Sequence, residues 1–317
     1  RPQVSAGVRL MAAPPPPPSD AAAVTLPGTG FQRDRGTQLR EVGFAGLLLA
    51  ALGISLVTLL VLILDIVIEG AGSLSGEFIS ETPSRIDPSS SGILPAIYGT
   101  LYLMAVCAAF IIPVGVASAI YLEEYADRSK WFNRLIEVNI QNLAAVPSIV
   151  YGVLGLAFLV RGPISLGSVV VAGGLTLGLL VLPVVIVAGR EAIRAVPPSI
   201  REGSMALGAT KWQTIWKQVL PAAIPGIATG TILALSRAIG ETAPLIVVGA
   251  IAFATTASTS FFDGKFSALP IQIFGWTADS NDEFKPLAAA AIIVLMAILL
   301  AMNAVAIWLR NRYEQKW

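Results

Sequence analysis

Histidine is absent from the sequence, and cysteine occurs once, as Cys107 within an apolar run. The lack of histidine excludes histidine-bound metals and histidine general bases, and a single cysteine excludes a disulfide within the chain. Charged residues are also scarce. They make up 13% of the chain against 55% hydrophobic residues, whereas a soluble domain carries about a quarter charged residues. Lipid is therefore the expected main solvent of this protein.

The first 40 residues differ in composition from the rest. Residues 14–18 form an unbroken proline run, and Ser, Asp, Ala and Gly follow it. Such a segment favours an extended chain and cannot bury an apolar core. We therefore expect residues 1–40 to be a disordered cytoplasmic tail and residues 41–317 to form a transmembrane domain. Met11 is the expected translation start, because ordinary initiation does not begin at an arginine.

Six apolar runs are long enough to cross a bilayer, whose hydrocarbon core of about 30 Å requires a helix of about 20 residues. The runs are residues 43–64, 92–122, 138–160, 168–189, 220–250 and 287–309. The fifth run is interrupted by two charged residues, Arg237 and Glu241. The chain is therefore predicted to be an all-α polytopic membrane protein with six transmembrane helices.

The distribution of Lys and Arg predicts how these spans are oriented. Basic residues gather before the first span, after the second, after the fourth and after the sixth, whereas the alternate loops are richer in Asp and Glu. Because Lys and Arg are enriched in cytoplasmic loops, both termini are predicted to be cytoplasmic. An even number of spans agrees with that prediction.

The loop between the fourth and fifth spans, residues 190–221, contains signals for two short helices. Ser199 with Glu202 three residues later matches a capping box, and Thr210 with Gln213 matches a second one. Gly208 precedes the second box, at a turn where a left-handed backbone conformation favours glycine. The pattern predicts a helix–turn–helix on the cytoplasmic surface.

An apolar ridge is expected on the second of these helices. Trp212, Ile215, Trp216 and Val219 recur at i, i+3, i+4 and i+7, which is the spacing of one helix face. The ridge fits either an amphipathic helix lying on lipid headgroups or a docking element for a soluble partner. Periodicity alone does not separate the two interpretations.

The loop also contains Glu202-Gly-Ser-x-x-x-Gly208, followed by Leu220-Pro221. This pattern resembles the EAA loop of ABC-importer permeases, although the family has two alanines where this chain has Gly203 and Ser204. In that family the loop fits a cleft in the ATPase subunit. The resemblance implies ATPase coupling through Glu202, Gly203, Ser204, Gly208, Trp212, Ile215, Trp216, Leu220 and Pro221.

Three other segments narrow the resemblance. Residues 236–245, 144–152 and 119–125 closely resemble the permeases of phosphate importers, specifically the PstA type. The resemblance covers roughly residues 92–310. It implies the type I permease fold of ABC importers and a bacterial inner membrane. The implied partners are an ATPase subunit dimer, a second homologous permease, and a periplasmic or extracellular phosphate-binding protein.

Arg237 and Glu241 are the residues within an apolar run that most strongly suggest function, because a charge at the bilayer centre costs about 3 kcal/mol. Arg237 lies 16 residues past Pro221, so it is expected between the midplane and the outer half of the membrane. Glu241, four residues later, can pair with it, and Pro244 is expected to kink or end the helix just beyond the pair. The pair either fixes helix packing or offers the arginine to an oxyanion. The resemblance favours the second role and adds Thr242 to the substrate path.

No phosphate-binding loop of the Gly-x-x-x-x-Gly-Lys-[Ser/Thr] type occurs in the sequence. Gly203 to Thr210 comes close, but Ala209 occupies the position of the essential lysine. We therefore expect a non-catalytic subunit that binds no cofactor, with ATP and Mg²⁺ held by the partner ATPase. No nucleic-acid partner is expected.

Three alternatives remain open at this stage. The first is an ABC permease for another oxyanion or small solute. The second is a stand-alone secondary transporter, although the inverted repeats and midplane acids typical of that class are not evident apart from Glu241. The third is an intramembrane enzyme, which the lack of a catalytic or metal-binding set argues against.

Overall fold

The computed structural model describes residues 35–127, 129–254, 261–262 and 264–313, and within these ranges all regular structure is helical. The chain divides into two units, Arg1–Leu59 and Leu60–Trp317. The proline-rich part of the expected tail and Met11 lie outside the described residues. The predicted all-α class is confirmed for the part that is described.

Helix α1 (Arg35–Ala71) contains the first predicted span. Its apolar window has a mean hydropathy of 3.0, and none of that window is buried against the rest of the chain. Large side chains such as Leu49, Ile54 and Val61 are exposed. A helix that is apolar on every side requires lipid or another protein as its surroundings.

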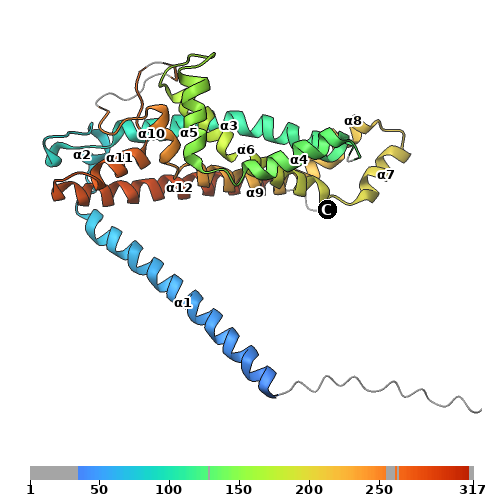
Figure 1. The fold of residues 1–317 in the computed structure, drawn as a ribbon, viewed down its shortest axis with the longest axis horizontal. Coiled ribbons are helices and arrows are strands. Elements are labelled where there is room, and N and C mark those ends of the chain that lie inside the picture. The colour runs from blue at the N-terminus through green and yellow to red at the C-terminus, as the bar shows by residue number, and fades with distance from the viewer. Residues whose placement is uncertain (1–34, 128, 255–260, 263, 314–317) are drawn as a thin grey trace, which may run out of the picture. The chain divides into compact units, whose positions relative to one another are not determined.

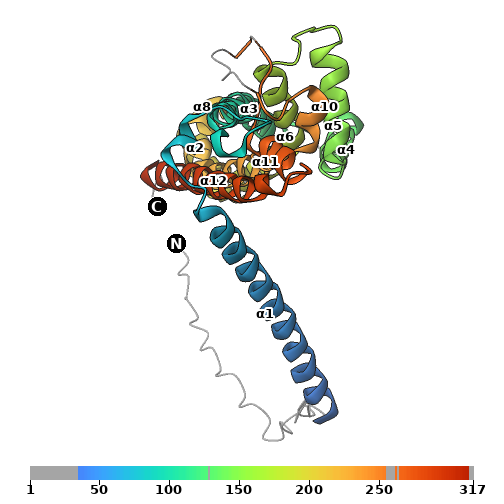
Figure 2. The same ribbon diagram turned by 90° about the vertical axis from the view of Figure 1, so that its left-hand side faces the viewer.

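The second unit contains the remaining helices, which are shown in Figures 1 and 2. They are α2 (Gly76–Ser80), η1 (Pro88–Ser90), α3 (Leu94–Ile120), η2 (Tyr121–Tyr125), α4 (Trp131–Leu143), α5 (Ser148–Gly155), η3 (Leu156–Val160), α6 (Val170–Arg194), α7 (Pro198–Ala206), α8 (Lys211–Thr214), η4 (Ile215–Val219), α9 (Leu220–Ala238), α10 (Ala243–Val248), α11 (Leu269–Thr277), η5 (Asp282–Phe284) and α12 (Lys285–Tyr313). Figure 1 shows α7 and α8 at one end of this unit and α2 and α11 near the other.

Glycines allow the long helices of this unit to pack closely. A Cβ on Gly174 or Gly178 would meet Val106 or Phe110 of α3 at 2.7 or 2.6 Å. Gly226 of α9 faces Ala192 of α6 in the same way. Glycine at such i, i+4 positions lets helix backbones approach each other in a membrane. The central core is therefore formed by α3, α6 and α9.

The third predicted span, residues 138–160, is not one straight helix. The chain forms α4 and then the pair α5–η3, which are bent by 108° relative to each other. Pro147 is the cause, because proline disfavours a helical conformation of the residue before it. Among the described residues, five helices are long and apolar enough to span a membrane, or six if the bent pair counts as one span. The predicted six spans therefore require one that is bent.

The fifth predicted span, residues 220–250, is also interrupted. Helix α9 ends at Ala238, and α10 starts again at Ala243. Pro244 lies in the first turn of α10. Backbone N–H groups in the first turn have no acceptor within the helix, so proline, which lacks an N–H, is tolerated there. The expected kink beyond the charged pair is therefore wrong, because the helix ends between Arg237 and Glu241.

Candidate functional site

Arg237 and Glu241 contact each other across the end of α9. Arg237 is the second-last residue of the helix, and its Nε lies 3.5 Å from Glu241 Oε1. The backbone N–H of Glu241 donates to the carbonyl of Ala238, which closes the turn after the helix. The arginine side chain is 49% exposed and the glutamate 19%. The predicted pairing is confirmed, and the single long contact leaves most guanidinium donors without a bond to Glu241.

The level of this pair along the helices follows from its neighbours on α12. Ser236 donates to Asn303 Oδ1 at 2.7 Å, and Arg310 donates to Thr229 at 3.0 Å, so α9 and α12 run antiparallel. Asn303 lies five residues beyond the middle of the last apolar run, or about 7 Å along a helix. Arg237 is therefore level with the C-terminal half of α12. The expected position of Arg237 between the midplane and the outer half of the membrane stays a prediction.

Apolar packing supports the pair from behind. Ala238 and Ile239 are buried in the same core as Leu245 of α10. A Cβ on Gly152 of α5 would lie 2.7 Å from the Cα of Pro244, so α5 and α10 touch at their backbones. The position of the helix break is thus fixed by contact with the bent third span.

Thr242, the third residue predicted to line the path, lies in the break and is partly buried. It precedes the first turn of α10, and its carbonyl accepts from Leu245 and Ile246. Its side chain makes no capping hydrogen bond to that helix. Its predicted contact with substrate stays a prediction.

The loop expected to contact an ATPase forms two short helices, as predicted. Thr210 and Gln213 form a complete capping box, and Gly208 has a φ of +86°, so both predictions are confirmed. The box expected at Ser199 is wrong. The capping position is taken by Pro197, two residues before Ser199, so helix α7 begins at Pro198, and Pro197 makes no side-chain capping bond.

Two of the four residues of the predicted apolar ridge are buried in the protein, and the other two are exposed on its surface. Ile215 and Val219 are almost fully buried, whereas Trp212 and Trp216 are 58% and 56% exposed. The two indole rings stack with centroids 5.5 Å apart. Residues 215–219 form a π-helical turn, which is wider than an α-helical turn. The wider turn directs Ile215 and Val219 into the protein and leaves Trp212 and Trp216 on the surface. The prediction of a single face is therefore wrong.

The other residues predicted to couple to the ATPase lie on the exposed surface, between α7 and α8, or at the start of α9. Glu202, Gly203 and Gly208 are exposed, and Ser204 Oγ lies 2.9 Å from Thr214 Oγ1, which joins α7 to α8. Leu220 and Pro221 are partly buried at the start of α9. The exposed part of the set is thus gathered on the two short helices.

Comparison with known proteins defines the family. Residues 111–316 match the model described as "Binding-protein-dependent transport system inner membrane component". The chain belongs to this family.

Several curated permeases are similar over most of the chain. The phosphate transport system permease protein PstA 1 of Mycobacterium tuberculosis (strain CDC 1551 / Oshkosh) is 34% identical, covering 70% of this chain and 71% of its own length. The PstA protein of Yersinia pestis is 30% identical, covering 76% and 79%. The probable ABC transporter permease YqgI of Bacillus subtilis is 32% identical, covering 79% and 88%.

Solved structures agree on the fold. A chain of a bacterial alginate ABC transporter matches with a TM-score of 0.61 at 15% identity, covering 87% of this chain and 96% of that one. A chain of the MetNI methionine ABC transporter in an inward-facing conformation matches with a TM-score of 0.56 at 16% identity, covering 70% and 98%. The permease described here therefore has the predicted type I importer fold.

An ionic cluster that the sequence pattern did not predict lies at the α7–α8 end of this permease. Glu123 and Glu124 bind three arginines that follow 67 to 77 residues later in the chain, namely Arg190, Arg194 and Arg201. The arginines were used only to predict orientation. Two adjacent acids at the end of an apolar run were the available signal, because carboxylates there need cationic partners or water.

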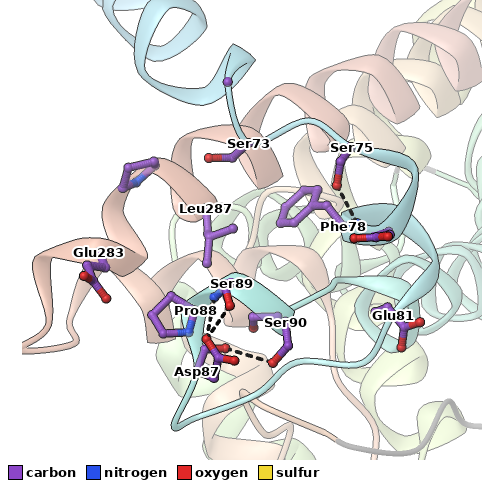
Figure 3. A pocket seen from close by; sticks show the side chains of 14 residues that line it. Ser73, Ser75, Phe78, Glu81, Asp87, Pro88, Ser89, Ser90, Glu283 and Leu287 are labelled. Atoms are coloured by element: carbon purple, nitrogen blue, oxygen red, sulfur yellow. Dashed lines mark hydrogen bonds between the residues drawn. The ribbon is translucent and has the colours of Figure 1, made fainter.

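A cavity of about 810 Å³ lies at the α2 end of the permease and is shown in Figure 3. Among its lining residues are four acids and five serines, and none of the described lining residues is Lys or Arg. Hydrogen bonds from Ser89 lower the pKa of Asp87, so its carboxylate stays ionised at neutral pH. This negative cavity is poorly suited to an anion, unlike the surroundings of Arg237.

Metal binding finds no support in the described part of the chain. No group of three or more His, Cys, Asp or Glu side chains there is placed to hold a metal ion.

Proposed function

We propose that this permease is the membrane-spanning subunit of an ATP-driven importer of inorganic phosphate, in which it forms half of the translocation path. The observation that carries the proposal is the half-exposed guanidinium of Arg237 at the break between α9 and α10. Relatives named as phosphate transport permeases support the choice of anion.

Arginine is suited to this task because its planar guanidinium offers five donors that match two oxygens of a phosphate at once. Glu241 accepts through one long contact of 3.5 Å, so it holds the arginine in place without saturating it. The glutamate also lowers the net positive charge at the break. An anion therefore binds weakly enough to leave again, which passage through a membrane requires.

Energy reaches this path from a separate ATPase in the proposed system. The exposed indoles of Trp212 and Trp216 and the exposed side of α7 provide a surface for that subunit. Aromatic side chains of this kind dominate the binding energy of protein interfaces. ATP and Mg²⁺ belong to the ATPase in this proposal.

The same proposal includes the partners of this chain, the membrane in which it lies and its orientation there. A second homologous permease completes the path, and a phosphate-binding protein delivers the anion on the extracytoplasmic side. The permease lies in a bacterial inner membrane with both termini in the cytoplasm. The negative cavity near α2 then faces outward, opposite α7 and α8.

Uptake of radiolabelled phosphate tests the substrate. Cells that lack their own importer receive this chain with its neighbouring subunits, and sulfate is added as a competitor. Restored phosphate uptake that excess sulfate does not reduce supports the proposal. An assembled complex that takes up no phosphate, or that prefers sulfate, leaves the family membership intact and refutes the proposed substrate. Uptake of phosphate by this chain without any ATPase would instead indicate a secondary transporter.

A further inference from the structure

The segment Tyr121–Tyr125 at the end of α3 is a π-helical turn with two adjacent acids. The side chains of Glu123 and Glu124 are only 9% and 10% exposed. Burying two neighbouring carboxylates is costly unless each has a cationic partner. Both have such partners, and the partners come from different helices.

Glu123 joins α3 to α6. Its two carboxylate oxygens accept from Nε and Nη2 of Arg194, each at 3.0 Å. Arg190, one turn earlier on α6, lies 3.6 Å from Glu123 and donates to Glu137 of α4 at 2.7 Å. Two-point contacts between arginine and carboxylate fix orientation as well as distance. The C-terminal ends of α3 and α6 and the middle of α4 are therefore held together.

Glu124 joins the same turn to the α7–α8 loop. Arg201 of α7 contacts Glu124 Oε1 through Nη2 at 3.0 Å and through Nε at 3.1 Å. Its remaining donors bind the carbonyls of Val196 and Ile193 at 2.6 and 2.8 Å, which lie at the end of α6. Arg201 therefore connects α7 to both α3 and α6.

Helix α8 is attached to the turn as well. The ammonium group of Lys211 donates to the carbonyl of Glu124 and lies 4.9 Å above the ring of Tyr125. A cation above an aromatic face is attracted by the ring electrons. Both short helices of the loop thus bind one five-residue turn, so they cannot move without moving it or breaking these contacts.

We propose that Glu123, Glu124 and Arg201 are coupling residues, which pass movements of the α7–α8 loop to α3 and α6. This inference rests on the proposed function, because it requires an ATPase that moves the loop. Exposed ion pairs contribute little and break easily, whereas both carboxylates and Arg201 are mostly buried and each makes several bonds. A rigid connection at this point turns a displacement of two short helices into a displacement of two long ones.

The first test uses the complete complex, with ATPase, second permease and binding protein, in lipid vesicles. Phosphate imported per ATP hydrolysed is measured for Glu124→Gln, Glu124→Arg, Arg201→Glu and the Glu124→Arg/Arg201→Glu double variant. Each single variant is expected to keep hydrolysing ATP while this ratio falls about ten-fold. The double variant is expected to raise the ratio about three-fold above Arg201→Glu, because the charge pair is restored in reverse.

The control is Glu191→Gln, which removes the partner of Arg194 from an exposed ion pair of 3.0 Å. Its ratio of transport to hydrolysis is expected to match that of the intact complex. The inference is overturned if the Glu124 and Arg201 variants keep the normal ratio at equal amounts of complex. It is also overturned if transport and hydrolysis fall in parallel, which indicates a structural role only.

Hydrogen exchange gives a readout that does not depend on phosphate. Binding of a non-hydrolysable ATP analogue is expected to change exchange in α7 and in residues 115–125 of the intact complex. In Glu124→Gln the change is expected to remain in α7 and to disappear from residues 115–125. If it persists there, the inference is wrong. If the intact complex imports no phosphate but shows this dependence on Glu124, the proposed substrate fails and the coupling role stands.

Discussion

Two charged regions of this permease are built in opposite ways. At the α9–α10 break, one arginine contacts one glutamate at 3.5 Å and remains half exposed. At the end of α3, Glu123 and Glu124 bind Arg194 and Arg201 through several contacts of 3.0 to 3.1 Å, and Arg190 lies 3.6 Å from Glu123.

The difference follows from what each region has to do. A group that binds and releases a passing anion needs donors that are not already occupied. A group that transmits movement needs most of its donors occupied, so that small rearrangements do not absorb the motion. The exception in this region is Arg190 Nε, which is buried without a hydrogen-bond partner. The contrast between sparse and saturated charges therefore separates the proposed path from the proposed coupling region.

The largest effect on stability is expected from Arg190→Met in the saturated region. The guanidinium is almost fully buried and contacts Glu123 and Glu137. Removing one partner of a buried ion pair costs about 3 kcal/mol or more, because the remaining charge is left buried. We expect the melting temperature of the purified complex to fall by on the order of 6 to 12 °C. Glu241→Gln, at the sparse site, is the matched comparison, and an equal loss there would remove the contrast between the regions.

A smaller effect is expected from Gly152→Ala behind the sparse region. The new Cβ would lie 2.7 Å from the Cα of Pro244 and 3.0 Å from Val247. Overpacking of this kind costs about 2 kcal/mol, and it displaces α10 and the break. Phosphate uptake is expected to fall with little loss of protein. Gly76→Ala, where no atom lies within 4 Å, serves as the control, and similar uptake by both variants would contradict this account.

The smallest effect is expected from Trp216→Ala on the exposed side of the coupling loop. The indole is 56% exposed and stacks only on Trp212 among the described aromatic rings, so the stability of the permease should hardly change. Loss of an interface tryptophan is expected to weaken ATPase binding about ten-fold. Affinity is measured with the solubilised permease pair and the purified ATPase. An unchanged affinity would indicate that the indoles lie on lipid instead.

Local signals in the sequence predicted the short helices near the loop well. The Thr210 capping box and the left-handed Gly208 depend only on neighbours within a few residues. Such local features can be predicted from sequence because they do not depend on distant parts of the chain. The prediction at Ser199 was wrong because the capping position is taken by Pro197, two residues earlier. Trp212 and Ile215 were assigned to one face because a π-helical turn leaves no clear periodic signal.

Hydropathy predicted where the chain meets lipid but not where the spans break. Residues 144–147 are apolar, and residues 239–242 contain one charge, Glu241, within a longer apolar run. Both segments are nevertheless breaks between helices in the structure. The Glu123–Arg194 and Glu124–Arg201 pairs join residues 71 and 77 positions apart. Partners so distant in sequence cannot be matched without the fold, so the saturated region was not foreseen.

The central claim is that Arg237 handles the transported anion, and the most direct measurement is the initial rate of phosphate uptake by Arg237→Ala and Arg237→Lys complexes at equal assembly. Uptake is expected to be abolished in Arg237→Ala and only partly retained in Arg237→Lys, because lysine keeps the charge but loses the guanidinium fork. Arg161→Ala, in the loop before α6, is the control and is expected to transport normally. If Arg237→Ala transports phosphate at the intact rate, Arg237 is a packing residue and the proposed path is wrong.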